Sequence, residues 1–346
     1  MKQSEVLKKL KSAKLVAPCR IELFDEVYDF QAGEKEAIVE VKAVGICGTD
    51  IHIFKGERKD VKLPRVMGHE LSGVVKQVGA GVSQVKPGDR VVLDPVFACG
   101  KCHVCLSGHP NVCGDVKCFG VQMDGGFQQY IKVPENCLYR FSPELSFSLA
   151  ALAEPFSIAA NIMERAQISS DDKVLIFGAG TIGLAVLQAA KAVGAFVMIS
   201  DLVEEKLKNA KSFGADAVVY SRKEELLQAL GDQIPGGPSV IIDAVGMASL
   251  LEASIAVAAP AARVVVIGFD ETQALVSPVS ITKRELTVLG SRMNCHQFGK
   301  VIDWLEAGKI RPEAMITKEF PLDKIQEAFE YTISHSEECI KTMITI

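Results

Sequence analysis

The chain has 346 residues, of which 48% are hydrophobic and 23% are charged, and its formal net charge at pH 7 is −5. The length favours two domains over a single core, and the composition is that of an ordinary soluble globular protein. The negative charge argues against nonspecific binding to nucleic acid or to a membrane surface.

The first third of the chain is rich in short β-type runs that glycine and proline separate. Residues 1–14 carry several lysines but no apolar stretch typical of a signal peptide. No apolar run is long enough to span a bilayer, so we expect a cytoplasmic protein. Residues 1–12 are interpreted as a short extension ahead of the first strand. The pattern predicts a β-rich, barrel-like unit with strands at residues 37–41, 72–75, 90–93 and 129–133.

The pattern changes near residue 145. A helix is expected at residues 150–166, and buried-looking strands then alternate with helices, which indicates a parallel sheet covered on both faces. The expected strands are 173–177, 196–200, 217–220, 240–243, 263–267 and 287–289, and the expected helices are 182–193, 204–213 and 223–230. From about residue 295 the tail holds a helix at 301–306, a short segment at 314–317, a helix at 322–334 and a final strand at 341–346.

Four cysteines with the spacing C-x2-C-x2-C-x7-C form one loop: Cys99, Cys102, Cys105 and Cys113. Four thiolates at this spacing can surround one zinc ion tetrahedrally. Such a site leaves no open coordination position and is therefore structural. An iron–sulfur cluster also uses four thiolates, and buried free cysteines or disulfides are further alternatives. Cys118 is a rival fourth ligand.

Three segments, at residues 45–52, 68–70 and 154–155, offer ligands for a second metal. Cys47 supplies a thiolate, His69 an imidazole, and Glu70 or Glu154 a carboxylate. A lone Gly-His-Glu is more often a core histidine beside a surface glutamate, but the combination with the cysteine loop is specific. A catalytic zinc takes three mixed protein ligands and keeps a fourth position open. It acidifies an alcohol bound there, as zinc-bound water falls to a pKa of about 7, and hydride can then pass to NAD.

Thr49 and His52 suit a proton exit from that site. Thr49 can take the proton from the substrate oxygen, and His52 can pass it towards solvent through the cofactor ribose. A histidine pKa near 6.5 suits this task. The alternatives are that Thr49 caps a helix beginning at Asp50 and that His52 is an ordinary helix-surface histidine.

A dinucleotide motif, G-x-G-x-x-G, occupies residues 178–183 between an expected strand and an expected helix. Its glycines let the backbone approach a pyrophosphate, which the helix N-terminus attracts. Asp201 follows the next strand, where a carboxylate binds the ribose hydroxyl and favours NAD over NADP. The alternative role of Asp201 is to cap the next helix. Residues 243–246 and 266–268 follow later strands of the same sheet and either line the cofactor cleft or form simple turns. The expected cofactor-binding residues are Gly178, Gly180, Thr181, Ile182, Gly183, Asp201, Val245 and Gly268.

These motifs, together with Asp-Gly-Gly-Phe at 124–127, resemble the zinc-containing medium-chain dehydrogenases/reductases over residues 13–346. The resemblance implies an α/β fold class, with a GroES-like catalytic domain at residues 1–150 and 295–346 and a Rossmann NAD-binding domain, a doubly wound parallel sheet, at residues 151–294. It implies that Cys47, His69 and either Glu70 or Glu154 hold the catalytic zinc, with Glu154 sometimes acting through water. Alcohol dehydrogenases proper tend to have cysteine at the position of Glu154. Glu-Pro-Phe-Ser at 154–157 instead resembles the polyol, threonine and sugar-acid branch.

Two arginines point to a substrate within that branch. Arg65 precedes His69 by four residues, and Arg292 follows the last expected sheet strand. The combination is similar to bacterial L-galactonate or L-gulonate 5-dehydrogenases. Arginine can hold a carboxylate in a two-pronged hydrogen bond, although a surface or domain-interface salt bridge is an equal alternative for each.

The sequence therefore predicts an oxidoreductase with two zinc ions per chain, one catalytic and one structural, and with NAD as hydride acceptor. The expected substrate is a hexonate such as L-galactonate or L-gulonate, followed by a polyol, a polyol phosphate or L-threonine. We expect a homo-oligomer, either a dimer or a tetramer, that binds neither nucleic acid nor membrane. A non-catalytic NAD- and zinc-binding module of the same fold is disfavoured because Cys47, Thr49 and His69 are all present. A zinc-free quinone reductase is disfavoured because it would lack the ligands.

Overall fold

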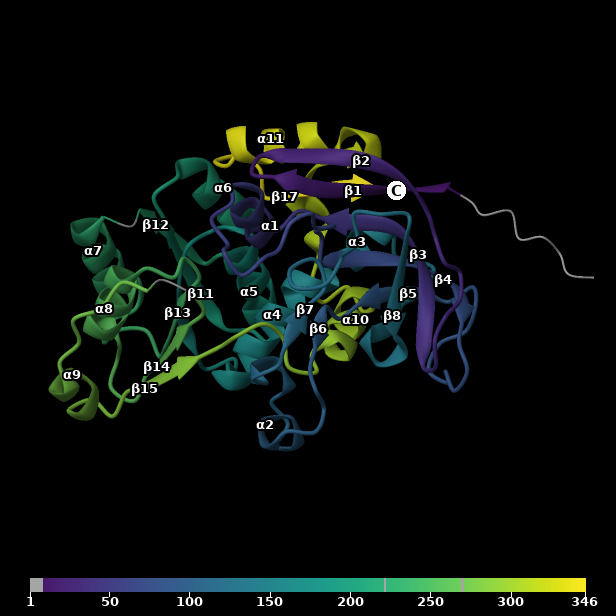
Figure 1. Ribbon diagram of the computed structural model, residues 1–346. Coiled ribbons are helices and arrows are strands. Elements are labelled where there is room, and N and C mark those ends of the chain that lie inside the picture. The colour runs from purple at the N-terminus through teal and green to yellow at the C-terminus, as the bar shows by residue number, and fades with distance from the viewer. Residues whose placement is uncertain (1–8, 221, 269–270) are drawn as a thin grey trace, which may run out of the picture. The chain divides into compact units, whose positions relative to one another are not determined.

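The computed structural model describes residues 9–220, 222–268 and 271–346 (Figure 1). The chain divides into two compact units. The first consists of Met1–Glu154, Phe298–Glu306 and Pro312–Ile346, and the second of Pro155–Gln297 and Ala307–Arg311. A β-rich unit and a unit with a parallel sheet confirm the predicted fold class. Within the described ranges, no helix combines the length and the apolar character needed to cross a membrane.

The first unit is organised around β3, a long strand that pairs with β4, β8 and the C-terminal strand β17. Among the described residues its sheet has the order β16-β17-β3-β4-β5-β9, with β8 also pairing with β3. The C-terminal strand thereby lies beside β3, with Met343 opposite Gly45. The bounds are β3 (Glu36–Gly45), β4 (Glu70–Val78), β5 (Arg90–Leu93), β8 (Tyr130–Pro134), β9 (Leu138–Arg140), β16 (Ile316–Pro321) and β17 (Lys341–Thr345).

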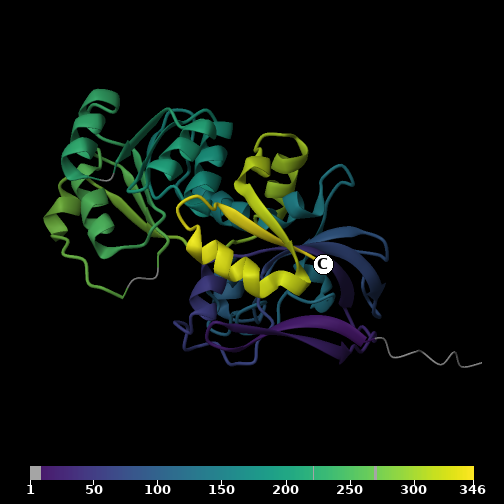
Figure 2. The ribbon, with the colours of Figure 1, turned by 90° about the horizontal axis from the view of Figure 1, so that it is seen from above.

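A hairpin of β1 (Lys9–Ala17) and β2 (Arg20–Val27) precedes this sheet. Interpreting residues 9–12 as an extension is therefore wrong, while residues 1–8 lie outside the described part of the chain. Lys9 and Lys11 are exposed, whereas Leu10 and Ser12 are buried, which is the alternation of a half-buried strand. The alternation breaks at Ala13, which is also buried. Helix α11 (Ile325–Ser334) lies against β2 (Figure 2), where the Ile21 N–H donates to Gln326 Oε1 at 2.9 Å.

Short elements complete the first unit and carry most of its candidate ligands. Strands β6 and β7 pair antiparallel. The helices α1, α2, α3 and α10 connect or cover the strands. The bounds are β6 (Val96–Phe97), β7 (Lys117–Cys118), α1 (Gly48–Phe54), α2 (His103–Leu106), α3 (Phe147–Ala151), α10 (Phe298–Glu306) and the 3-10 turns Pro110–Val112, Glu135–Cys137, Pro312–Met315 and Leu322–Lys324.

The second unit is built on a parallel sheet with the strand order β12-β11-β10-β13-β14-β15 in the described residues. Helix α5 lies on one side of these strands, and α7 and α8 lie on the other (Figure 1). Because both faces are covered, the central strands are almost continuously apolar. The bounds are β10 (Lys173–Phe177), β11 (Phe196–Asp201), β12 (Ala217–Tyr220), β13 (Val240–Asp243), β14 (Arg263–Val266), β15 (Thr287–Gly290), α5 (Thr181–Ala192), α6 (Glu204–Ser212), α7 (Lys223–Gln233), α8 (Ala248–Val257) and α9 (Pro278–Thr282).

The helix expected at residues 150–166 is broken in the structure. Helix α3 ends at Ala151, and α4 (Ala153–Arg165) begins two residues later. Pro155 explains the break because it has no N–H to donate to the carbonyl four residues earlier. Restarting the helix places Pro155 in a first turn, where N–H groups have no partner within the helix anyway.

Candidate metal centres and cofactor site

Asp50 connects the two loops that carry Cys47 and His69. It is fully buried. One of its carboxylate oxygens accepts the Cys47 N–H at 2.9 Å, and the other accepts the Gly68 N–H at 3.2 Å. Cys47 is the N-cap of α1, so the expectation that this helix opens at residue 50 is wrong. Thr49 consequently lies inside the first turn instead of capping it.

The donor atoms of Cys47, His69 and Glu70 form a compact cluster, all lying within 4.8 Å of one another. His69 Nδ1 lies 3.6 Å from Asp50 Oδ1, close enough for charge attraction but too far for a hydrogen bond, and Nδ1 is buried without a hydrogen-bond partner among the described residues. Burial alone lowers the pKa of His69, but the nearby Asp50 and Cys47 charges raise it well above its ordinary value. A pocket that stabilises an extra proton in this way also favours a cation, and its sulfur, nitrogen and oxygen donors suit zinc.

Lys341 forms a buried ion pair with the Glu70 carboxylate. Its ammonium donates to both Glu70 oxygens at 2.7 Å and to the Ile46 carbonyl at 3.1 Å. Both charged side chains are almost completely buried, at 2% and 1% exposure. Burial by itself lowers the pKa of Lys341, but the Glu70 charge outweighs it and raises that pKa above its ordinary value. Glu70 is therefore one half of a buried, neutralised ion pair.

Glu154 is also buried, at the start of α4. Burial is the main cause that raises the pKa of Glu154 to about 7, opposed by the charge of His69. Its side chain is thus close enough to His69 to sense its charge, although it is not part of the compact donor cluster. Cys118 lies in the same environment. Its pKa rises to about 12 through burial, while His69 lowers it and Glu154 raises it.

Thr49 and His52 both lie on α1, one turn apart. The His52 ring is exposed, and its Nδ1 lies 2.5 Å from Glu57 Oε2. The structure therefore gives His52 a carboxylate partner that the motif does not reveal.

The four-cysteine loop brings its sulfurs together without bonding them. The Sγ–Sγ distances range from 3.5 Å for Cys102–Cys105 and Cys99–Cys113 to 3.9 Å for Cys99–Cys105. All four are free thiols, and the distances far exceed a disulfide bond of about 2.05 Å. Four sulfurs around one zinc, with bonds of about 2.3 Å, lie roughly 3.8 Å apart. This spacing fits a single ion better than an iron–sulfur cluster, in which the four thiolates are divided among two or four irons.

The thiols of this loop differ in acidity. Backbone N–H groups of Lys101 and Cys102 lower the pKa of Cys99 to about 6. Burial and the neighbouring Cys102 and Cys113 thiols instead raise the pKa of Cys105 to about 12. Cys118, the rival ligand, does not belong to this group; its thiol donates to the Phe119 carbonyl instead.

The glycine motif forms the turn between β10 and α5, where each glycine meets a different requirement. Gly178 has a φ of +96°, which favours glycine. A Cβ on Gly183 would collide with the carbonyl oxygen of Gly178. Gly180 is the N-cap of α5, and a Cβ there would meet no atom within 4 Å. The open space at this helix N-terminus fits a pyrophosphate, which the helix dipole attracts.

Two carboxylates border this turn. Asp201 accepts the Ala179 N–H at 2.7 Å and the Val203 N–H at 2.9 Å, so it bridges the glycine loop and the start of α6. Asp243 is buried and accepts the N–H groups of Val245 and Gly246 at 3.0 and 2.7 Å. The loops after β13 and β14 approach so closely that a Cβ on either Gly246 or Gly268 would collide with the other backbone.

The two arginines have different surroundings. Arg65 is half-buried, and its Nη1 donates to Asp124 Oδ1 at 2.7 Å, which gives it a structural partner within the chain. Arg292 lies exposed in the turn after β15. Asn161 holds this turn by donating to the Met293 carbonyl at 3.0 Å. The structure thus positions the Arg292 turn through its backbone.

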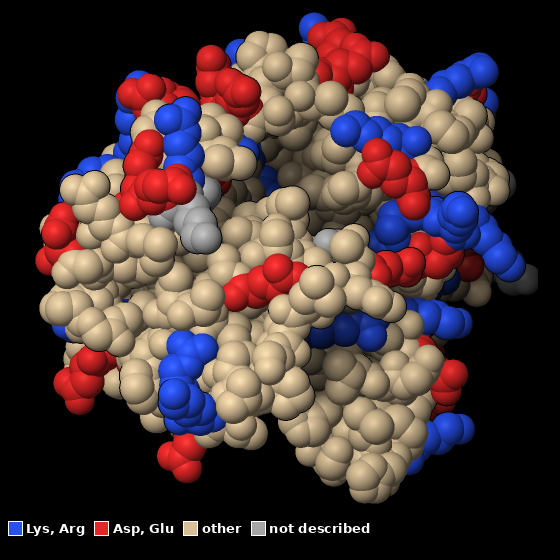
Figure 3. All heavy atoms as spheres, turned by 90° about the vertical axis from the view of Figure 1, so that its left-hand side faces the viewer, with Lys and Arg blue, Asp and Glu red and all other residues tan. Residues whose placement is uncertain are grey.

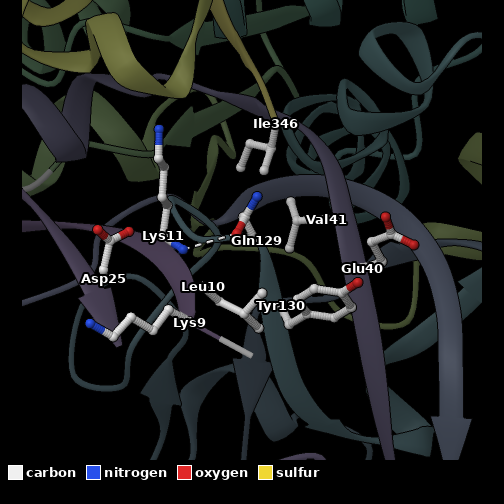
Figure 4. Close-up of a pocket in the computed structure, with 9 residues that line it drawn as sticks. All are labelled: Lys9, Leu10, Lys11, Asp25, Glu40, Val41, Gln129, Tyr130 and Ile346. Carbon is white, nitrogen blue, oxygen red and sulfur yellow. Dashed lines mark hydrogen bonds between the residues drawn. The ribbon is translucent and has the colours of Figure 1, made fainter. Parts of the chain in front are cut away.

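One cavity in the first unit, of about 320 Å³, is lined by residues such as Lys9, Asp25, Glu40 and Tyr130 (Figure 4). It contains no cysteine, no histidine and none of the predicted ligands. On the face drawn in Figure 3, basic and acidic side chains are interspersed, so this face presents no extended field of one sign.

Asp50 and Lys341 are the site residues that sequence reasoning missed. Asp50 stands inside the motif at residues 45–52, and a buried carboxylate beside two ligand loops could have been suspected there. Lys341 is 271 positions from Glu70. Nothing in its local sequence distinguishes it from other strand residues.

Comparisons with known proteins identify two matching domains and several similar chains. Residues 33–143 match the alcohol dehydrogenase GroES-like domain, and residues 181–307 match the zinc-binding dehydrogenase domain. The starvation-sensing protein RspB of Escherichia coli K12 is 38% identical over 312 residues, covering 90% of this chain and 92% of RspB. The crystal structure of rspB from E. coli CFT073 with NADH has a TM-score of 0.94 and 36% identity, and the match covers 98% of this chain and 100% of that one.

Two relatives with named substrates are also similar. The D-arabitol-phosphate dehydrogenase of Enterococcus avium is 35% identical and covers 91% of each chain. The L-galactonate-5-dehydrogenase of E. coli K12 is 33% identical, covering 90% of this chain and 92% of its own.

Proposed function

The chain belongs to the zinc-binding alcohol dehydrogenase family with a GroES-like domain, and we propose that it oxidises a secondary alcohol of a sugar acid such as L-galactonate or L-gulonate. It is an NAD-linked alcohol dehydrogenase. The observation that supports this most is the mixed sulfur, nitrogen and carboxylate cluster of Cys47, His69 and Glu70 in a chain that also has the open glycine turn.

Zinc at this cluster supplies Lewis acidity for an alcohol oxygen, and NAD supplies the hydride acceptor. Cys47 and His69 are two of its ligands. The third is a carboxylate, either Glu70, which lies in the cluster while Lys341 donates to both of its oxygens, or Glu154, which lies outside the cluster. Asp50 lies beside His69 and holds the two ligand loops together.

The proton released from the alcohol leaves through α1. Thr49 accepts this proton from the substrate hydroxyl and passes its own proton on. His52, one turn later on α1, receives a proton through the cofactor ribose and passes it towards solvent. The exposed His52 ring suits exchange with water.

The second unit binds NAD. Gly178, Gly180 and Gly183 shape the pyrophosphate turn with Thr181 and Ile182 at the start of α5, Asp201 takes the ribose hydroxyls, and Val245 and Gly268 border the nicotinamide end. To bind the ribose, Asp201 keeps one oxygen on the Ala179 N–H and offers the other in place of its Val203 contact. The cysteine loop Cys99–Cys113 holds the second, structural zinc.

Arg292 is the better candidate of the two arginines for a substrate carboxylate. Only 16% of the Arg65 side chain is exposed. Arg292 is exposed after the last strand of an open parallel sheet, at the strand end where ligands of such sheets gather. A fixed guanidinium favours an aldonate over a neutral polyol.

A polyol phosphate is the second candidate, because a D-arabitol-phosphate dehydrogenase is among the similar relatives. The same guanidinium could hold a phosphate. Neutral polyols rank below both because they carry no group that needs an arginine. L-threonine has a carboxylate that an arginine could hold, but it ranks lower because the two relatives with named substrates described above act on a sugar acid and a polyol phosphate.

The substrate test is a screen for NADH formation over aldonates, hexitols and hexitol phosphates. We expect L-galactonate or L-gulonate to give the highest kcat/KM. Arg292→Ala should lower kcat/KM for the acid about tenfold to a few hundredfold, as expected for losing charge-assisted hydrogen bonds of roughly 1.5–3 kcal/mol. It should leave the value for a hexitol nearly unchanged. Efficient turnover of a polyol phosphate without any aldonate would reject the sugar-acid assignment in favour of the second candidate.

A further inference from the structure

The turn that ends α1 brings Glu57 back over His52. The Glu57 N–H donates to the His52 carbonyl at 3.0 Å, and the Gly56 N–H donates to the Ile53 carbonyl at 2.9 Å. These two bonds define a Schellman motif, whose turning residue is commonly a left-handed glycine. Gly56 has a φ of +77°, and a Cβ there would lie 2.9 Å from the Pro18 side chain. The backbone of this turn therefore fixes the position of the Glu57 Cα relative to His52.

The Glu57 carboxylate uses this position to engage the imidazole. Its Oε2 lies 2.5 Å from His52 Nδ1. The hydrogen bond made by one ring nitrogen decides which nitrogen carries the proton in neutral histidine. A carboxylate at Nδ1 keeps the proton there and leaves Nε2 with a lone pair. His52 Nε2 is thereby ready to accept a proton.

We propose that Glu57 is a positioning residue of the proton exit, which fixes the tautomer and orientation of His52 and balances its charge when Nε2 takes up the proton. The proposal rests on the proposed role of His52 in alcohol oxidation. The alcohol loses one proton to the Thr49 hydroxyl, Thr49 passes its own proton on, and Nε2 gains the relayed proton while Nδ1 keeps its own on the Glu57 side. NAD, when bound, would supply the acceptor for the hydride. Water then removes the proton from Nε2.

The alternative is that this pair is only a surface ion pair. Both side chains are largely exposed, at 64% for His52 and 51% for Glu57, and exposed pairs contribute little to folding. A matched control exists in the same unit. Glu327 pairs with Lys324 at 3.3 Å with 61% and 56% exposure. Losing Glu327 removes a comparable ion pair far from α1 in sequence.

The first test reads the tautomer directly and does not depend on turnover. Ring ¹⁵N shifts of the zinc-loaded protein, labelled at histidine and assigned with His52→Gln, are recorded above the ordinary histidine pKa of about 6.5. We expect the Nδ1–H tautomer at His52 in the wild type and in Glu327→Ala. In Glu57→Ala the two tautomers should mix. Glu57→Gln retains an acceptor oxygen and should keep part of the preference. A wild-type His52 in the Nε2–H form, or one that Glu57→Ala leaves unchanged, overturns the proposal.

The second test separates positioning from structure by kinetics. Glu57→Ala should lower kcat about two- to fivefold, the factor that corresponds to an exposed ion pair of up to ~1 kcal/mol, with little change in KM. In a His52→Gln background the same substitution should have no further effect. An equal loss in both backgrounds means that Glu57 does not act through His52. If the wild type oxidises no alcohol with NAD, the proposed function fails, while the tautomer measurement still decides whether Glu57 sets the ring.

Discussion

Lys341→Met is the substitution whose cost can be worked out most directly from the structure. It removes a cation that donates three hydrogen bonds, two of them to Glu70, in a place where neither partner reaches solvent. The methionine has similar length, so little packing is lost, and the main effect is an uncompensated carboxylate in the core. Removing one partner of a buried pair costs about 3–5 kcal/mol. We expect that loss in the unfolding free energy of the first unit.

Three further variants test whether the loss of stability in Lys341→Met comes from the unpaired Glu70 carboxylate. Glu70→Gln alone leaves Lys341 without its carboxylate and should also be destabilised. The double variant removes both charges, so its loss should be at least ~2 kcal/mol smaller than the sum of the single losses. Lys324→Met, which removes only an exposed pair, should cost less than ~1 kcal/mol. Urea unfolding at fixed zinc concentration measures all four. A Lys341→Met loss as small as that of Lys324→Met, or strict additivity in the double variant, would refute the buried-pair reasoning.

The remaining predictions concern the other sites. Cys105→Ser should lower the melting temperature, because three thiolates bind zinc less well than four. Cys47→Ser should leave the melting temperature nearly unchanged and abolish NADH formation. The opposite pattern would reverse the assignment of the two sites. Asp201→Ala should lower the preference for NAD over NADP in kcat/KM, and a wild type that already prefers NADP would contradict this role. Burial alone raises the pKa of Asp172, but hydrogen bonds from the Ser169 N–H and the Ser239 hydroxyl and the charge of Arg263 lower it overall. The stability that this carboxylate contributes should therefore be complete above the ordinary aspartate pKa of about 3.9. It should be lost as the pH falls through the lower pKa that Asp172 has in the folded chain. The urea midpoint of Asp172→Asn should accordingly depend less on pH in that acidic window than the midpoint of the wild type.

Much of the second unit could be predicted because its strands carry their own signal. Buried β-branched runs such as Val240–Asp243 lie between two layers of helices, so burial makes them continuously apolar, and their bounds could be located from the sequence. The glycine turn was equally visible, since its spacing follows from close backbone approach. The hairpin of β1 was missed because buried and exposed residues alternate only over residues 9–12 and the alternation breaks at Ala13.

The candidate metal site was predictable only in part. Cys47 and His69 stand in recognisable motifs, but their geometry depends on Asp50, whose carboxylate joins two loops through backbone N–H groups. Lys341 comes from the last strand, and its contact with Glu70 exists only because β17 pairs beside β3. Such long-range contacts follow from topology, which a local pattern does not contain. The sequence therefore gives no sign of the buried ion pair that Glu70 forms with Lys341.

Zinc content, measured by elemental analysis of the purified wild type beside Cys47→Ser, tests the central claim most directly. Two donor clusters with different chemistry are present in the described chain, one of cysteines alone and one of mixed type. The account predicts two zinc ions per wild-type chain and one in Cys47→Ser, with the fold retained. A single metal in the wild type, iron with acid-labile sulfide, or an unchanged zinc content in Cys47→Ser would contradict it.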